Sequence, residues 1–226
     1  MEKIYVGKTK DVYLAEDGNC ILVFKDSVTG TDGVFDPGAN TVGLSIEGIG
    51  KSNLKLSTFF FEILNEAGIK THFISSDIDA GTMTVKRAKV FGKGLEVVCR
   101  LYAVGSFIKR YGDYIKEGTK LPSYVEFTLK DDAKDDPLII SDALEILGIM
   151  DKNQYDRIAE MTREITAIIS AEFAKKGLTL YDIKFEFGNV DGEMILIDEI
   201  ASGNMRVYRD GSIVDPMELS KIMLGD

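Results

Sequence analysis

The sequence has little of the two residue types that most often build compact metal centres and disulfide frameworks. Its 226 residues include only two cysteines, Cys20 and Cys99, and one histidine, His72. The cysteines lie too far apart in sequence for a C-x-x-C site and are too few for a disulfide framework, so both are expected to be reduced residues of the core. A single histidine also excludes a histidine-rich zinc site.

Long apolar runs and an apolar signal core are also missing. No stretch approaches the roughly 18 apolar residues that a membrane helix needs, and Met1–Tyr5 leads directly into polar sequence. The sequence therefore predicts a cytoplasmic protein that has no membrane partner. With 45% hydrophobic and 28% charged residues, the composition is that of an ordinary globular chain, long enough for one large or two small domains.

Positive charge is in the minority. The chain has 27 Lys and Arg against 37 Asp and Glu, a formal net charge of -10, which argues against a nucleic-acid polymer as partner. The excess is uneven, because residues 1–130 carry 17 basic and 16 acidic side chains whereas residues 131–226 carry 10 and 21. All of the excess negative charge therefore lies in residues 131–226.

Neither of the common nucleotide-binding loops is present. The chain has no G-x-x-x-x-G-K-[ST] loop and no G-x-G-x-x-G fingerprint, which removes P-loop and Rossmann sites. A nucleotide would therefore have to bind on strands.

The hydrophobic pattern predicts helices and strands without regular alternation. Apolar spacing and a capping-box pair, Asp151 and Gln154, predict a long helix over 151–176, and Asp215 with the following proline opens a last helix. Another helix is expected over 53–67, after a long loop over 26–50. Expected strands are an antiparallel hairpin over 5–24 and segments 83–90, 95–101, 124–129, 178–187 and 194–200. This order favours an α+β fold.

One predicted strand carries ionisable residues on a single face. The period-two rule places Asp182, Lys184 and Glu186 together. If the following turn is centred on Val190, Asp182 lies opposite Asp198. Two carboxylates so close together require either a cation or a raised pKa of one of them. If the cation is a metal ion, oxygen ligands suit Mg²⁺. A solvated strand face is the alternative, but the partner strand is otherwise so apolar that its acids favour a site.

Basic residues recur where an anion could bind. Gly7–Lys10 forms a predicted strand-to-strand turn with two lysines, and Arg100 precedes a hydroxyl flanked by glycine, Ser106. Guanidinium groups bind phosphate or carboxylate bidentately, and glycine lets the backbone approach. Arg206 is a further candidate. A solvated basic turn is the alternative interpretation of Gly7–Lys10 taken alone.

Taken together, these segments resemble the SAICAR synthetase family, the phosphoribosylaminoimidazole-succinocarboxamide synthases of purine biosynthesis, over nearly the whole chain. Each motif is weak by itself, and the shared order carries the resemblance. The matching segments are Tyr5–Lys10, Asp32-Gly33, Glu66–Thr71, Arg100 to Ser106 with Lys109-Arg110, Lys130–Asp132 with Asp136-Pro137, Asp182–Gly188, and Asp198-Glu199 to Arg206.

The resemblance implies an ATP-dependent ligase that joins carboxyaminoimidazole ribonucleotide to L-aspartate and releases ADP and phosphate. It implies a two-lobed α+β fold, with an antiparallel β-rich N-terminal lobe over 1–90, a larger α+β C-terminal lobe over 91–226 and ATP in the cleft between them. It also makes a homo-oligomer plausible.

The resemblance further implies roles for individual residues. Lys8 and Lys10 would bind ATP phosphates, and Glu186 and Asp198 would hold Mg²⁺. Asp182 and Lys184 would be catalytic. The residues expected to bind the ribonucleotide are Asp32, Arg100, Ser106 and Arg206.

The sequence departs from the family pattern in three places. The family's Ser-Pro-Asp is Ala201-Ser202-Gly203 here, its Asn-Asn-Lys is Asn53-Leu54-Lys55, and Leu101 stands where Asn is common. All three changes alter polar groups that could touch the substrate or the amine. Two alternatives follow: a related ligase that uses another amine or carboxylate, and a nucleotide-binding homologue without catalytic activity.

Overall fold

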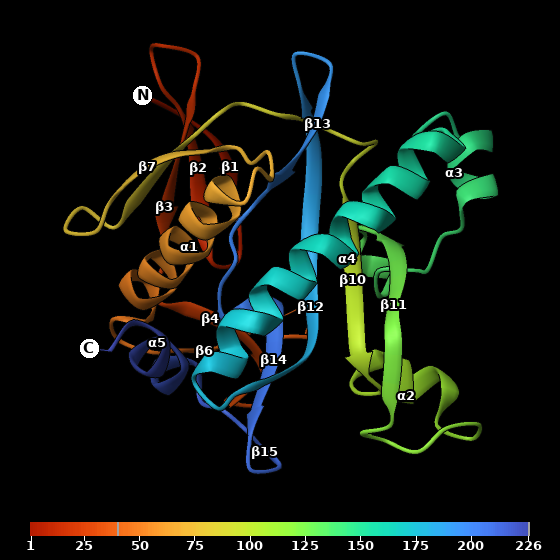
Figure 1. The fold of residues 1–226 in the computed structure, drawn as a ribbon. Helices are drawn as coiled ribbons and strands as arrows, with labels where there is room; N and C mark the ends of the chain where they lie inside the picture. Colours follow the sequence, from red (N-terminus) through yellow and green to blue (C-terminus); the bar gives the residue numbers. More distant parts are fainter. Residues whose placement is uncertain (40, 226) are drawn as a thin grey trace.

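Two antiparallel sheets form the framework of the computed structural model, which describes residues 1–39 and 41–225 (Figure 1). The first sheet has the order β1-β2-β3-β8-β7. Its strands are β1 (Glu2–Val6), β2 (Lys10–Leu14), β3 (Cys20–Phe24), β8 (Thr82–Val85) and β7 (Phe73–Asp77). The predicted hairpin over 5–24 is confirmed as part of this sheet.

The second sheet is larger and is centred on β12 (Thr179–Val190). Its main path is β11-β10-β12-β14-β15, and β13 and β9 also pair with β12. The remaining strands of this sheet are β9 (Lys89–Val90), β10 (Leu95–Tyr102), β11 (Lys120–Leu129), β13 (Glu193–Ile197), β14 (Met205–Arg209) and β15 (Ser212–Ile213). The α+β fold class is therefore confirmed. A division into separate lobes at residue 90 stays a prediction, since one buried core runs across both sheets.

The segment 26–50, expected to be a loop, is instead partly ordered as strands. A small sheet of β4 (Ser27–Thr31), β5 (Val34–Phe35) and β6 (Val42–Ser45) runs in the order β5-β4-β6. Its strands have two to five residues and its glycines pack tightly, so the usual alternation of apolar side chains is weak. The loop expectation was wrong for this reason.

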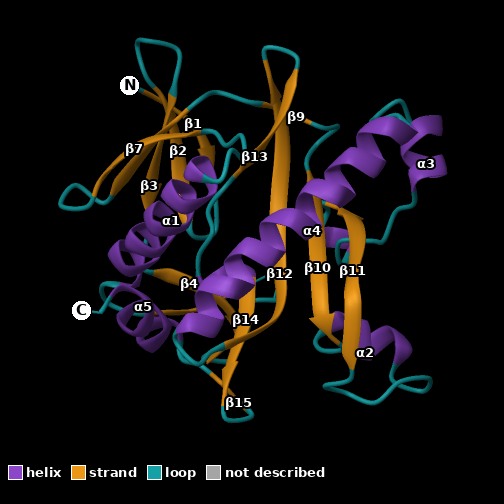
Figure 2. Ribbon diagram, in the orientation of Figure 1, coloured by secondary structure: helices purple, strands orange, loops and turns teal. Residues whose placement is uncertain are grey.

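The described residues form five α-helices (Figure 2). The two long ones are α1 (Ile49–Glu66) and α4 (Lys152–Lys175), and the short ones are α2 (Ser106–Tyr111), α3 (Ser141–Ile146) and α5 (Pro216–Leu224). The predicted capping box is present, because Asp151 accepts a hydrogen bond from the Gln154 amide and Gln154 accepts one from the Asp151 amide.

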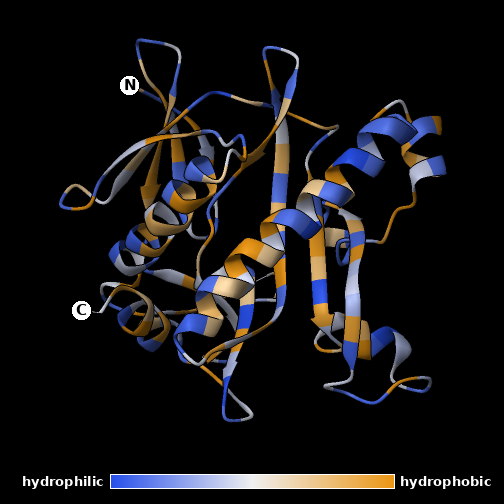
Figure 3. Cartoon of the chain, in the orientation of Figure 1, coloured by the Kyte–Doolittle hydropathy of each residue, from blue (hydrophilic) through white to orange (hydrophobic). Residues whose placement is uncertain are grey.

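The helices α1 and α4 share the core between them. Each is amphipathic, with apolar and polar residues on different faces (Figure 3). Phe60 of α1 meets Phe173 of α4 edge to face, with ring centroids 5.3 Å apart, and both side chains are fully buried. Cys20 and Cys99 are free and buried as expected. No helix in the described part of the chain is long and apolar enough to cross a membrane.

Helix α1 begins at Ile49, four residues before the predicted start. Gly48 precedes it in the left-handed conformation without a side-chain cap, so no Ser, Asp or Asn marked this start in the sequence. Within α1, Asn53 and Ser57 reach the segment that follows β13. Ser57 Oγ accepts a hydrogen bond from the Ile200 amide at 2.7 Å, and Asn53 Oδ1 accepts one from Ser202 Oγ at 2.7 Å. The helix therefore fixes the chain that leaves β13.

Replacing Ser57 by Ala should destabilise the fold, because the buried Ile200 amide would lose its partner. We expect the free energy of unfolding in urea to fall by about 1–3 kcal/mol. Thr58→Ala is the matched control, since the Thr58 hydroxyl bonds only a carbonyl of its own helix; this change should cost less than about 0.5 kcal/mol. Equal effects of the two variants would contradict this role of Ser57.

Candidate functional site

A cleft of about 1000 Å³ lies along one face of β10, β11 and β12 and is bounded by the β1–β2 turn and by the chain after β13. The three ionisable residues of β12, Asp182, Lys184 and Glu186, all line it, as the period-two pattern predicted. Phe185 and Phe187 of the same strand are buried in the core. The strand therefore divides a polar cleft from an apolar interior.

The predicted pairing of Asp182 with Asp198 is wrong. The β12–β13 turn is formed by Asp191 and Gly192, both with positive φ, so Val190 pairs with Glu193 rather than lying at the centre of the turn. As a result, Asp182 lies opposite Arg100 on one side and Arg206 on the other. It is Glu186 that comes close to Asp198.

Lys10 binds two consecutive acids at the end of β13. Its Nζ lies 2.5 Å from Asp198 Oδ1 and also pairs with Glu199, which in addition accepts a hydrogen bond from Thr9 Oγ1 at 3.1 Å. Neighbouring residues of an extended strand point in opposite directions. Asp198 has a φ of 71°, a left-handed conformation that is uncommon for a residue other than glycine. This bend at Asp198 ends the regular alternation of the strand.

Two further lysines bind the acids of the sheet. Lys130 Nζ lies 2.5 Å from Glu186 Oε1, and Lys184 Nζ lies 2.6 Å from Glu96 Oε1. Glu96 and Glu186 are directly opposite each other on β10 and β12, so like charges meet across the strands. The lysines offset this repulsion.

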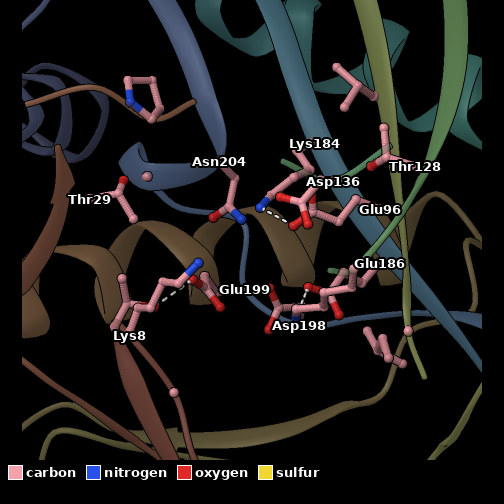
Figure 4. Close-up of a pocket in the computed structure, with 18 of the residues that line it drawn as sticks. Lys8, Thr29, Glu96, Thr128, Asp136, Lys184, Glu186, Asp198, Glu199 and Asn204 are labelled. Carbon is pink, nitrogen blue, oxygen red and sulfur yellow. Dashed lines mark hydrogen bonds and ion pairs between the residues drawn. The ribbon is translucent and has the colours of Figure 1, made fainter. Parts of the chain in front are cut away.

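Burial and neighbouring charges set the protonation of this cluster. Burial raises the pKa of Glu186, and the charge of Asp198 raises it further. Burial also opposes the charged form of Asp198, but Lys10 and Lys130 outweigh it and hold the pKa of Asp198 below its usual range. Figure 4 shows the two carboxyl side chains next to each other in the cleft. Cations at this position are required to keep both groups ionised.

Arg100 anchors a second cluster on the same sheet. It donates to Asp182 Oδ2 from Nη1 at 2.6 Å, to Glu126 Oε1 from Nε at 2.9 Å and from Nη2 at 2.5 Å, and to Ser106 Oγ from Nη2 at 2.8 Å. Arg100, Asp182 and Glu126 are each at most 4% exposed. Buried charges of this kind are stable only when they are paired.

Arg206 lies beside Arg100 and shares its acid. It donates to Asp182 Oδ2 at 2.8 Å and to Asp36 Oδ1 at 3.0 Å. Two glycines leave room for its guanidinium. Gly105 has a φ of 58°, and a Cβ there would come within 2.7 Å of the guanidinium carbon, while a Cβ on Gly38 would also overlap the group. The position of the Arg206 guanidinium therefore depends on the absence of a side chain at both glycines.

The structure brings together nearly all of the predicted site residues. Those that line the cleft are Lys8, Lys10, Arg100, Ser106, Asp182, Lys184, Glu186, Asp198 and Arg206. Lys8 lies at its edge and pairs with Asp132 at 2.8 Å. Asp32 does not join them: it is exposed at the β4–β5 turn, and Asp36 makes the contact with Arg206 instead. The roles expected of these residues stay predictions.

Several acidic or basic residues of the cleft were missed as site residues, among them Glu96, Glu126, Lys130 and Glu199. Lys130 and Glu199 lie within motifs that the sequence shares with the SAICAR synthetase family, and these motifs could have identified them as site residues. Glu96 lies four positions before Arg100 on the same strand face, so the period-two pattern could have found it. The place of Glu126 in the site could not be predicted without knowing how β10 and β11 pair.

The carboxylates of the first cluster fit a magnesium ion held jointly with phosphate. Within the described residues, no group of three His, Cys, Asp or Glu side chains is arranged to hold a metal alone. Mg²⁺ usually takes one or two carboxylates together with substrate phosphates and water. Glu186 and Asp198 supply two such carboxylates, and both are already paired with ammonium groups that a cation could replace.

Comparison with known proteins identifies relatives over the full chain. A sequence model of the SAICAR synthetase family matches residues 3–221. A phosphoribosylaminoimidazole-succinocarboxamide synthase of Clostridium tetani is 54% identical over 226 residues, covering 99% of this chain and 100% of that protein.

Solved structures with the same fold include a SAICAR synthetase in complex with ADP. Its TM-score is 0.86 at 31% identity, covering 98% of this chain and 97% of that one. The phosphoribosylaminoimidazole-succinocarboxamide synthase of Ehrlichia chaffeensis has a TM-score of 0.84 at 29% identity, covering 99% and 94%.

His72 lies behind the acidic cluster and should remain uncharged in the folded protein. Its Nε2 is 2.9 Å from the backbone oxygen of Asp198, and burial lowers its pKa from 6.5 to about 4. The unfolded chain therefore binds a proton between these pH values and the folded chain does not. This contribution to stability is complete above pH 6.5 and is lost as the pH falls; by pH 5 the loss should reach about 2 kcal/mol.

The single histidine makes this prediction directly measurable. The Cε1–H resonance of His72 in an NMR pH titration should keep its neutral position down to about pH 5, given a pKa near 4. Unfolding free energies measured at pH 7.5 and 5 test the same point. A resonance that titrates with a midpoint near the model-peptide value of about 6.5 would contradict the buried, neutral assignment.

Proposed function

The chain belongs to the SAICAR synthetase family, and we propose that it is the ATP-dependent ligase that joins carboxyaminoimidazole ribonucleotide to L-aspartate, with release of ADP and phosphate. The observation that carries this proposal is the pairing of two charged clusters on one sheet face. One cluster combines lysines with two facing carboxylates, and the other combines two neighbouring arginines with a hydroxyl. The first suits a nucleotide with its metal, and the second suits an anionic substrate.

We place the nucleotide phosphates at the β1–β2 turn. Lys8 lies within this turn and Lys10 is the first residue of β2, and both line the cleft. The related SAICAR synthetase that was solved with ADP supports a nucleotide in this fold. Each lysine now pairs with acids, Lys8 with Asp132 and Lys10 with Asp198 and Glu199. Phosphate oxygens would take over these ammonium groups.

We assign Mg²⁺ to Glu186 and Asp198. Bound there together with phosphate oxygens, Mg²⁺ would neutralise charge that develops during phosphoryl transfer. The chain itself supplies Lys10 and Lys130 beside the same carboxylates, so the charge of both acids stays compensated while ligands exchange. The magnesium ion, the homo-oligomer and the cytoplasmic location stay predictions.

We assign the ribonucleotide to Arg100, Ser106 and Arg206. Arginine recognises phosphate and carboxylate oxygens through a planar pair of N–H groups. Asp182 holds the two guanidinium groups side by side and would act through them. Asp32, which lies apart from these residues, is a weaker candidate for this role.

Lys184 lies between the two clusters, where an acyl phosphate would form. Burial works against its charged form, but Glu96 and Glu186 outweigh burial and raise the pKa of Lys184. The ammonium therefore stays protonated and cannot act as a base near neutral pH. It is suited to stabilising negative charge as the γ-phosphoryl group passes to the substrate carboxylate. The neutral amine of aspartate then attacks the acyl carbon, and phosphate leaves.

A second candidate function is the same activation chemistry with another amine. Gly203 stands where the family pattern has Asp, and it lines the cleft with no atom within 4 Å of the position that a Cβ would occupy. The carboxylate expected from the pattern is missing, and the space for it is open. This observation concerns only the amine, because the proposed metal and phosphate residues are all present.

The purified protein should release ADP only when ATP, Mg²⁺, carboxyaminoimidazole ribonucleotide and an amine are all supplied. We expect aspartate to be the preferred member of a panel of amino acids, measured by coupled ADP release and by product mass. Glu186→Gln should lower kcat by at least about 100-fold, because an electrostatic group of this kind contributes roughly 3 kcal/mol to the transition state.

The outcomes separate the three functions. Turnover with another amine and none with aspartate would support the second candidate. Nucleotide binding without any turnover would overturn both ligase proposals and favour a homologue that only binds. Unchanged turnover in Glu186→Gln would refute the metal assignment.

A further inference from the structure

Glu126 of β11 is a buried acid of the cleft to which the proposed chemistry gives no role. It is 4% exposed, and two arginines donate hydrogen bonds to it: Arg100 at 2.9 and 2.5 Å, and Arg110 Nη2 at 2.8 and 2.7 Å on its two oxygens. A buried carboxylate is tolerated only when it is paired. Arg100 and Arg110 supply the partners of Glu126.

Strand pairing explains how Glu126 reaches Arg100. On one side, Arg100 of β10 lies directly opposite Asp182 of β12. On the other side, its direct partner on β11 is Tyr124, and Glu126 is two residues further along β11, which makes it a diagonal neighbour of Arg100. One guanidinium is thus held from both sides by strands whose positions the sheet fixes. A side chain bound in this way has one orientation.

All five N–H groups of Arg100 have partners. Nε donates to Glu126, Nη1 donates to Asp182 and to the Val104 carbonyl at 3.3 Å, and Nη2 donates to Glu126 and Ser106. An anionic substrate must therefore replace one of these partners. Removing one member of a buried ion pair is strongly destabilising because it leaves the other charge buried and unpaired. Replacing a hydroxyl acceptor leaves no such charge behind, so the Ser106 contact is the easiest one to exchange. Ser106 is exposed.

We propose that Glu126 is a positioning residue for the anionic ribonucleotide: together with Asp182 it fixes Arg100 so that only the Nη2 edge beside Ser106 is available to the substrate. This inference rests on the proposed function, because it takes Arg100 to be a substrate ligand. The substrate anion replaces or shares the Ser106 contact, and the two carboxylates keep their places.

Arg110 has a supporting part in this arrangement. It extends from the last turn of α2 to Glu126, while Ser106 begins the same helix and contacts Arg100. Glu126 therefore holds the last turn of α2 directly, through Arg110, and the first residue of α2 indirectly, through Arg100. The helix also packs through Phe107 on Tyr124, with ring centroids 5.5 Å apart, so α2 keeps an anchor when the charge of Glu126 is removed.

Glu126→Gln removes the charge and keeps the size of the side chain. We expect the KM for the ribonucleotide to rise at least tenfold while the KM for ATP changes less than twofold. Glu126→Asp keeps the charge but withdraws the carboxylate by one methylene, and should raise the KM for the ribonucleotide by a smaller factor. A purely structural role would instead lower the amount of active protein or change both KM values together.

Two further variants make the result decisive. Glu160→Gln breaks an exposed Arg–Glu pair with Arg157 on α4 and serves as the matched control, with both KM values unchanged. Arg100→Met should raise the KM for the ribonucleotide more than Glu126→Gln does. If Arg100→Met has no effect, the proposed substrate site is wrong. If Arg100→Met has its effect but both Glu126 variants match the wild type, the positioning role is refuted and the proposed function stands.

Discussion

Neutralisation of buried carboxylates across neighbouring strands is the constraint on which this site depends. Acids at β10, β11, β12 and the end of β13 all face one cleft, and each is paired with a lysine or arginine from another strand or turn. An isolated charge in such a place would cost several kcal/mol, and two facing acids would cost more. The sheet register decides which cation reaches which acid. A change in strand register would therefore also leave buried charges without partners.

This constraint also prepares the cleft for ligands. Lysines pair with the carboxylates proposed to hold a metal, and a hydroxyl pairs with the arginine edge proposed to meet an anion. At the first cluster a metal cation would replace ammonium groups of the same sign. At the second cluster an anion would replace a neutral hydroxyl and would face the positive charge of the arginines. The two clusters lie at different points along β12, separated by Lys184, so a nucleotide and an acidic substrate bound as proposed would lie on opposite sides of one ammonium group.

Much of this arrangement could be predicted from local sequence, and its limits have physical causes. The alternation in β12, the capping box at Asp151 and the basic turn at Lys8 and Lys10 depend on neighbouring residues, and the structure has all of them. The predicted pairing of Asp182 with Asp198 is wrong by a small shift in strand register. The turn between β12 and β13 is Asp191-Gly192, a sequence that favours a two-residue hairpin turn, and is not centred on Val190. Glu126 and Asp36 meet their arginines only through long-range pairing, which no local pattern contains.

We propose that the Glu186–Asp198 cluster holds the metal and that the Arg100–Arg206 cluster holds the substrate anion. Crystals grown with ADP, Mn²⁺ and the ribonucleotide would locate both ligands, the metal through the anomalous signal of manganese. We predict a peak between the carboxylates of Glu186 and Asp198, with Lys10 moved to a phosphate oxygen and the ribonucleotide anion at Arg100 Nη2. A manganese peak away from both carboxylates, with Lys10 still bound to Asp198, would contradict the account.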